Sequence, residues 1–229
     1  MSTTEMPATP LVPTGPRARV RQGVQPIARG LGRLGLTPNA LTLIGFGIAV
    51  VAAWLAAEQA WLAAGILVAF GALFDLFDGA LARATGTASK FGAFLDSTFD
   101  RAGEAVVYLG IAWGLNVAGF PDSGLFAMAA MASAFMVSYV RAKSESLGFT
   151  PGTGMASVGL APREVRTVFV VIGLAGAGLA GGLGQPMWVN STGLLAIGGS
   201  MSAITLLASF TTIQRIFHVY REAKKQEQQ

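Results

Sequence analysis

The chain has 229 residues, of which 52% are hydrophobic and only 12% are charged, with a formal net charge of +4. A soluble domain carries about 25% charged residues, so this composition disfavours a soluble enzyme, a nucleic-acid-binding protein and a disordered protein. There is no cysteine and only one histidine, His218, which leaves too few ligands for a zinc–cysteine or multi-histidine metal site. The composition therefore predicts an integral membrane protein that uses carboxylate chemistry.

The N-terminal part of the chain is polar and basic. Residues 1–23 are expected to form a disordered tail, because proline and threonine dominate their first sixteen positions. Residues 24–36 alternate apolar side chains with Arg29 and Arg33. This alternation predicts a short amphipathic helix on the cytoplasmic membrane surface, with an irregular basic linker as the alternative. One membrane domain over residues 24–220 and a polar C-terminal tail over residues 221–229 complete the expected organisation.

Six apolar stretches follow, and each is long enough to cross a bilayer as a helix of about 20 residues. They are continuous rather than alternating, which argues against a transmembrane β-barrel. The sequence thus predicts an all-α integral membrane protein with six transmembrane helices behind an N-terminal amphipathic surface helix. The expected spans are residues 40–58, 60–83, 91–117, 123–147, 165–184 and 190–216.

The basic residues predict the orientation of these spans. All 16 lysine and arginine residues lie before the first stretch, around the second and fourth connections, or at the end of the sixth stretch and beyond it. Positive charge favours the cytoplasmic side. We therefore expect a multi-pass protein of the cell membrane with both termini in the cytoplasm, and a basic face that meets anionic lipid headgroups.

Four aspartates lie within apolar stretches, where each costs about 2.5–3.5 kcal/mol to insert. Asp75 and Asp78 close the second stretch three residues apart, and Asp96 and Asp100 open the third stretch four residues apart. Each pair shares one helix face, and the short connection over residues 84–90 makes the two helices antiparallel neighbours. Four carboxylates that converge need compensating cations. Oxygen ligands alone favour Mg²⁺ or Mn²⁺, and two such ions are a recurrent device of phosphoryl transfer.

A different class of protein, a small ion-coupled transporter, also binds ions through membrane carboxylates. It predicts carboxylates near the bilayer midplane on broken helices, whereas these four lie near helix ends. A further acidic residue, Glu104, follows Asp100 by one turn and is expected to pair with Arg101.

The string Asp75-x2-Asp78-Gly79-x2-Ala82-Arg83-x8-Gly92-x3-Asp96-x3-Asp100 resembles the signature of the CDP-alcohol phosphotransferase family at all eight fixed positions. The resemblance extends from about residue 25 onward. It implies a membrane bundle that forms homodimers, phospholipid biosynthesis from CDP-diacylglycerol with release of CMP, and two divalent ions at the acidic cluster. Asp75, Asp78 and Asp96 resemble the family's metal ligands, and Asp100 resembles a residue that is both metal ligand and general base.

The same resemblance implies the donor-binding residues. They are Gly79, Arg83 and Ser89 in and after the motif, together with Asn39, Ala40, Leu41 and Thr42 at the mouth of the first span. From the residues alone, the stretch that begins at Thr37 and Pro38 predicts only a turn and a helix N-cap.

Four cations share the cytoplasmic face with the aspartates: Arg141, Lys143, Arg163 and Arg166. They are explained either by positive-inside topology alone or by a pocket for an anionic acceptor, a small phosphorylated polyol. The segments 138–145 and 162–166 are similar to those of bacterial phosphatidylinositol phosphate synthases, which implies inositol phosphate as the acceptor. The chain departs from that pattern in the order of Arg141 and Lys143 and at Ala161-Pro162, so glycerol 3-phosphate stays an alternative acceptor.

Overall fold

The computed structural model describes residues 26, 30, 32–149, 159–180 and 191–227, and the fold is all-helical over these residues. The expected tail over residues 1–23 lies outside them, as does much of the expected surface helix over residues 24–36. In the part of that segment that is described, residues 26, 30, 32 and 33 are helical. The main helices are α2 (Pro38–Ala57), α3 (Trp61–Thr85), α4 (Lys90–Val117), α5 (Pro121–Ser146), α6 (Arg163–Ala180) and α7 (Ser191–Glu227).

These helices agree with the six predicted stretches to within a few residues at most ends. The clearest difference is α7, which continues beyond the expected end at residue 216 to Glu227, through most of the polar tail. Among the described residues, four helices (α2, α3, α5 and α7) are long and apolar enough to cross a membrane. The chain is therefore a multi-pass membrane protein.

The helices α4 and α6 fall short of that apolar standard because they carry charge near their first turns. Asp96, Asp100, Arg101 and Glu104 lie between the second and the fifth turn of α4, and the first turn of α6 carries Arg163, Glu164 and Arg166. All of these residues except Glu164 belong to the site or to the charged network beside it described below. The departure from a uniform apolar span is thus confined to the helices that supply charged groups.

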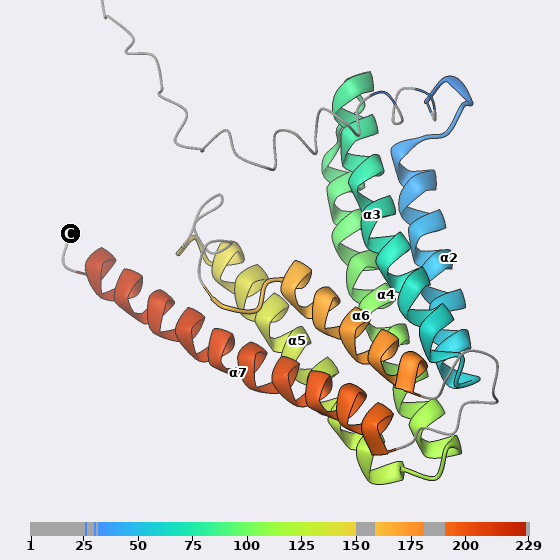
Figure 1. Ribbon diagram of the computed structural model, residues 1–229. Coiled ribbons are helices and arrows are strands. Elements are labelled where there is room, and N and C mark those ends of the chain that lie inside the picture. The colour runs from blue at the N-terminus through green and yellow to red at the C-terminus, as the bar shows by residue number, and fades with distance from the viewer. Residues whose placement is uncertain (1–25, 27–29, 31, 150–158, 181–190, 228–229) are drawn as a thin grey trace, which may run out of the picture.

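Two groups of helices make up the bundle (Figure 1). In the first group, α2 packs on both α3 and α4. In the second group, α7 packs on both α5 and α6, and the groups are joined by contacts of α3 with α6 and of α4 with α5. Figure 1 shows the second group lying obliquely beside the first.

The close approach of α4 to α2 depends on glycine. A Cβ atom added at Gly110 would collide with the backbone of Ala53, and one added at Gly114 would collide with the backbone of Ala56. Small residues allow helix backbones to approach closely in membranes, where packing rather than the hydrophobic effect drives association. This contact holds the C-terminal part of α4 against the C-terminal end of α2.

Local sequence signals begin and end the helices at the site. The Thr37 hydroxyl accepts the backbone N–H of Ala40 at 3.2 Å, and Pro38 follows at the first helical position, as the predicted N-cap requires. Ser89 caps α4 by accepting the N–H of Gly92 at 3.0 Å. Gly86, with φ of 66°, ends α3 in the left-handed conformation that favours glycine. The connection between α3 and α4 is therefore short and fixed at both ends.

Candidate active site

Two adjoining cavities lie at the motif-bearing ends of the helices. The first, which we call the Arg83 cavity, has a volume of about 200 Å³. The second, the Asp100 cavity, has a volume of about 70 Å³. Thr42 of α2 and Asp96 of α4 line both cavities. A molecule bound across them would therefore contact the acidic motif from either side.

The Arg83 cavity gathers most of the residues predicted to bind the donor. Its lining comes from α2, α3, α4 and the α3–α4 connection, and it includes Asn39, Thr42, Gly79, Arg83 and Ser89. Two predicted donor residues, Ala40 and Leu41, are not part of this lining. The Leu41 side chain is buried against Ala80 and Leu81 of α3 instead.

Glycines leave room for the polar groups of this cavity. A Cβ atom at Gly79 would lie 3.2 Å from Nη1 of Arg83, so the guanidinium folds back over that glycine. A Cβ atom at Gly92 would lie 3.2 Å from the Ser89 hydroxyl and 3.3 Å from the Asn39 side-chain oxygen. The fixed glycines of the motif thus bring an arginine, a hydroxyl and an amide to one wall.

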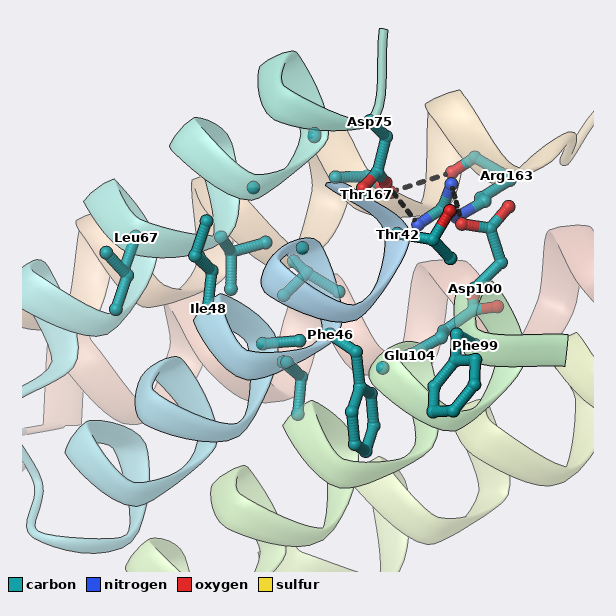
Figure 2. A pocket seen from close by; sticks show the side chains of 18 of the residues that line it. Thr42, Phe46, Ile48, Leu67, Asp75, Phe99, Asp100, Glu104, Arg163 and Thr167 are labelled. Carbon is teal, nitrogen blue, oxygen red and sulfur yellow. Dashed lines mark hydrogen bonds and ion pairs between the residues drawn. The ribbon is translucent and has the colours of Figure 1, made fainter. Parts of the chain in front are cut away.

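The Asp100 cavity holds an ion triad made by three different helices (Figure 2). Arg163 of α6 donates from Nη2 to Oδ2 of Asp75 at 2.7 Å, and its Nη1 lies 2.7 Å from Oδ1 of Asp100. Figure 2 shows the guanidinium between the two carboxylates. Gly45 of α2 makes space for the triad, since a Cβ atom there would lie 3.0 Å from Oδ1 of Asp75. One cationic group therefore contacts an aspartate from each half of the motif.

The other two aspartates are placed less completely. Asp96 is half-buried between the two cavities, whereas the side chain of Asp78 lies outside the described part of the structure. Among the side chains that are described, no three acidic groups are arranged to hold a metal ion. The four-aspartate metal centre therefore stays a prediction. In this conformation the Arg163 guanidinium takes up oxygens of Asp75 and Asp100 that such a centre would use.

A second charged network lies one turn deeper along α4. Arg166 of α6 donates to both oxygens of Glu104, at 2.7 and 2.9 Å, and to the carbonyl of Ala161 at 2.9 Å. Arg101 also pairs with Glu104 at 3.2 Å, which confirms the predicted pairing. Arg166 is only 2% exposed. A buried charge of this kind needs the partners that it has here.

The structure separates the four predicted acceptor residues. Of these, only Arg163 lines the Asp100 cavity, and Arg166 acts as the buried partner of Glu104. Arg141 pairs with Glu145 on the exposed face of α5 at 2.9 Å, and Lys143 is exposed near the same helix end. The four residues thus lie on one end of the molecule without forming one set of contacts.

Sequence reasoning missed one cation, Arg215 of α7. It is only 4% exposed and donates from Nη1 to the carbonyl of Val137 on α5 at 2.6 Å. It lies within electrostatic range of Arg141 and Arg166. The available signal was an arginine at the end of an apolar stretch, the same kind of signal that identified the aspartates.

The position of the carboxylates argues against the transporter alternative. Asp75 lies in the last three turns of α3, and Asp96 and Asp100 lie in the first three turns of α4. Both helices are continuous. The broken helices expected of such a transporter are therefore not found at these residues.

The chain is similar to known proteins over most of its length. Residues 35–214 match the family described as CDP-alcohol phosphatidyltransferase. The chain is 42% identical over 156 residues to an archaetidylinositol phosphate synthase from Pyrococcus horikoshii, covering 68% of this chain and 78% of that one. It is 36% identical over 209 residues to a phosphatidylinositol phosphate synthase from Cutibacterium acnes, covering 90% of this chain and 96% of that one.

Solved structures are similar over most of the chain. The crystal structure of Mycobacterium tuberculosis phosphatidylinositol phosphate synthase with CDP-DAG bound has a TM-score of 0.74 at 28% identity, covering 87% of this chain and 94% of that one. A structure of the same enzyme in complex with manganese and citrate has a TM-score of 0.72 at 28% identity, covering 86% of this chain and 88% of that one.

Proposed function

Because the chain belongs to the CDP-alcohol phosphatidyltransferase family, we propose that it transfers the phosphatidyl group of CDP-diacylglycerol to inositol phosphate, with release of CMP. The observation that carries this proposal is the junction of the two cavities. An arginine and hydroxyl groups line one of them, and carboxylates with Arg163 line the other. The relatives named above are synthases of inositol phosphate lipids, which supports this acceptor over glycerol 3-phosphate.

The Arg83 cavity is proposed to bind the CDP part of the donor. The Arg83 guanidinium is suited to bidentate contact with a phosphate, and the N-terminus of α4 at Ser89 offers backbone N–H groups to the same anion. Asn39, Thr42 and Gly79 complete the wall. Ala40 and Leu41 are proposed to act indirectly, because the first is part of the Thr37 cap and the second packs on α3.

Asp75, Asp78, Asp96 and Asp100 are proposed to hold two divalent ions, Mg²⁺ or Mn²⁺. The donor set fits such ions because it consists of carboxylate oxygens. The geometry also fits in part, since Asp75 and Asp100 already contact one cationic group, the Arg163 guanidinium, at 2.7 Å each. When bound, such ions neutralise charge on the diphosphate and on the leaving CMP. A structure of a relative in complex with manganese supports the assignment.

Asp100 is proposed to be the general base. It takes the proton from the acceptor hydroxyl, and the oxygen of that hydroxyl forms a bond to the phosphorus that bears the lipid. The bond between that phosphorus and the oxygen bridging it to the CMP phosphate breaks, and CMP leaves with the electron pair. Placement of the hydroxyl beside both the base and the phosphorus supplies much of the rate enhancement.

The acceptor is proposed to enter beside Arg163, with its phosphate facing the basic end of the bundle. Arg163 is partly exposed and lines the Asp100 cavity. Arg141 and Lys143 at the end of α5 add positive potential around the entrance. Arg166 supports the site through its pair with Glu104, and Arg215 adds a further buried cation on α7.

The membrane arrangement is part of the same proposal. All six helices α2 to α7 are proposed to cross the cell membrane as a homodimer, with both termini and the site on the cytoplasmic side. The ends of α3 and α5 and the starts of α4 and α6 carry the basic residues that favour this orientation. Residues 24–220 would form the membrane domain, and residues 1–23 and 221–229 its polar tails.

The test is a CMP-release assay on the purified full chain in liposomes that contain CDP-diacylglycerol. Inositol 1-phosphate, glycerol 3-phosphate and free inositol are compared, each with Mg²⁺ or Mn²⁺ and each with and without EDTA. The proposal expects release of CMP that depends on inositol 1-phosphate and is abolished by EDTA. A response to glycerol 3-phosphate alone would replace the acceptor, and the absence of any acceptor-dependent release would overturn the proposed function.

A further inference from the structure

One buried hydroxyl joins the segment before α6 to the far end of the chain. The hydroxyl of Thr211, on α7, accepts the backbone N–H groups of Leu160 and Ala161 at 3.0 Å each, and it donates to the carbonyl of Leu207 at 2.8 Å. A hydroxyl has one proton and two lone pairs, so these three bonds use its full capacity. Thr211 is completely buried. This contact connects residues about fifty positions apart in the sequence.

Packing holds the same segment against α7. Gly159 has φ of +117°, and a Cβ atom there would collide with the side chain of Thr211. Only glycine allows this close approach at that backbone conformation. Two residues further on, Ala161 is buried in a small cluster with Val137 of α5 and Ala208 of α7. The chain from 159 to 161 is therefore fixed by contacts on both sides.

This fixed segment leads directly into the candidate site. The carbonyl of Ala161 accepts a hydrogen bond from Nη1 of Arg166 at 2.9 Å. The carbonyl of Pro162 accepts the N–H groups of Val165 and Arg166 at 3.1 and 3.2 Å, which begins the first turn of α6. Arg163 is the first residue of that helix. A shift of the segment would therefore move Arg163 relative to Asp75 and Asp100 (Figure 2).

We infer that Thr211 is a positioning residue for acceptor recognition: its hydroxyl fixes residues 160–162 so that the Arg163 guanidinium lies over Asp100. The inference rests on the proposed function, because it takes the Asp100 cavity as the place where a phosphorylated acceptor binds. It also predicts selectivity. The residues that line the Arg83 cavity come from the region of α2, α3 and α4, with none from α6 or α7, so loss of the Thr211 contact leaves the donor side in place.

The chain supplies a matched control next to this residue. Thr212 is also buried on α7, and its hydroxyl donates to the carbonyl of Ala208 within the same helix at 3.0 Å. Thr211→Val and Thr212→Val therefore make the same chemical change at neighbouring positions, and the first of them removes the bonds to residues 160 and 161. Thr211→Ser keeps the hydroxyl and tests for rescue.

The experiment measures KM for inositol 1-phosphate and for CDP-diacylglycerol, together with kcat, in liposomes with Mg²⁺. For Thr211→Val we expect a rise of about tenfold in KM for inositol 1-phosphate, the size typical for loss of a hydrogen-bonded placement, with KM for CDP-diacylglycerol unchanged. Thr211→Ser and Thr212→Val are expected to match the wild type in both constants. Hydrogen exchange measured by mass spectrometry should show loss of protection confined to residues 159–166 in Thr211→Val.

Several results would overturn the inference. An unchanged KM for inositol 1-phosphate in Thr211→Val, equal rises in both KM values, or failure of Thr211→Ser to rescue would each do so. If Thr211→Val does not fold, Thr211→Ala carries the same expectation, and failure of both to fold would assign Thr211 to the stability of the bundle alone. Failure of the proposed function is distinguishable: the wild type then releases no CMP with inositol 1-phosphate, and the exchange experiment still shows whether Thr211 fixes residues 159–166.

Discussion

Arg163 contacts carboxylate oxygens that the proposed metal ions need. Removal of its guanidinium should therefore strengthen metal binding and, at the same time, raise KM for the acceptor. The Arg163 guanidinium is 2.7 Å from both Asp75 and Asp100. The exposed fraction of the side chain is 31% for Arg163, 24% for Asp75 and 19% for Asp100. Pairs with this degree of solvent access are worth about 1 kcal/mol each. The two pairs together oppose metal binding by about 2 kcal/mol, or about 30-fold in Kd.

The variant Arg163→Gln removes the charge and keeps most of the side-chain length. Titration of the detergent-solubilised, substrate-free protein with Mn²⁺, followed by the electron paramagnetic resonance signal of free Mn²⁺, should show a Kd about 30-fold lower than that of the wild type. KM for inositol 1-phosphate should rise in the same variant. Arg141→Gln is the matched control for Mn²⁺ binding, because Arg141 pairs with Glu145 and does not line the Asp100 cavity. Equal or weaker Mn²⁺ binding by Arg163→Gln would refute competition for the aspartates.

Three further substitutions test other parts of the argument. Asp100→Asn should lower kcat, measured by CMP release, by about 10²–10⁴-fold, whereas a direct binding measurement should show that CDP-diacylglycerol still binds. Near-normal turnover would refute the assignment of Asp100 as the base. Glu104→Gln leaves Arg166 buried without its ionised partner, which should destabilise the fold by about 3–5 kcal/mol, and an unchanged Tm in detergent would show that the pair is dispensable. Gly110→Val should prevent the close packing of α4 on Ala53 and lower Tm, whereas the same change at Gly47, which has open space around it, should have little effect.

The sequence predicted the helices and the family well because both depend on local patterns. Apolar stretches of membrane length lie close to the helices that the structure has, and the cap at Thr37 follows from its place before Pro38. That most of the predicted donor residues lie together was also predictable, since Gly79, Arg83 and Ser89 of the Arg83 cavity lie within one short hairpin. The exceptions are Ala40 and Leu41, which do not line the cavity. The buried packing of Leu41 on α3 depends on the tertiary arrangement.

The partners of the basic residues were not predictable in the same way. Arg163 and Arg166 lie far from Asp75 and Glu104 in the sequence, and their pairing depends on how α6 packs against α3 and α4. A count of cations on the face predicted to be cytoplasmic gives no information about which carboxylate each of them contacts. For the same reason Arg215 was missed, because only the structure shows that it is buried against α5.

The two arginines of α6 show how one helix serves the site with two different contacts. Arg163 and Arg166 are three residues apart, so they point to the same side of α6, and both meet acidic groups of α4. Arg166 is almost completely buried and binds Glu104 through two hydrogen bonds, so its release would leave unpaired charge in the interior. Arg163 is partly exposed in a cavity, so water or the proposed acceptor phosphate can take over its hydrogen bonds at low cost, and a metal ion bound by the aspartates would displace it from them. Burial therefore separates a fixed structural pair from an exchangeable one, and the exchangeable arginine is the one next to the proposed base.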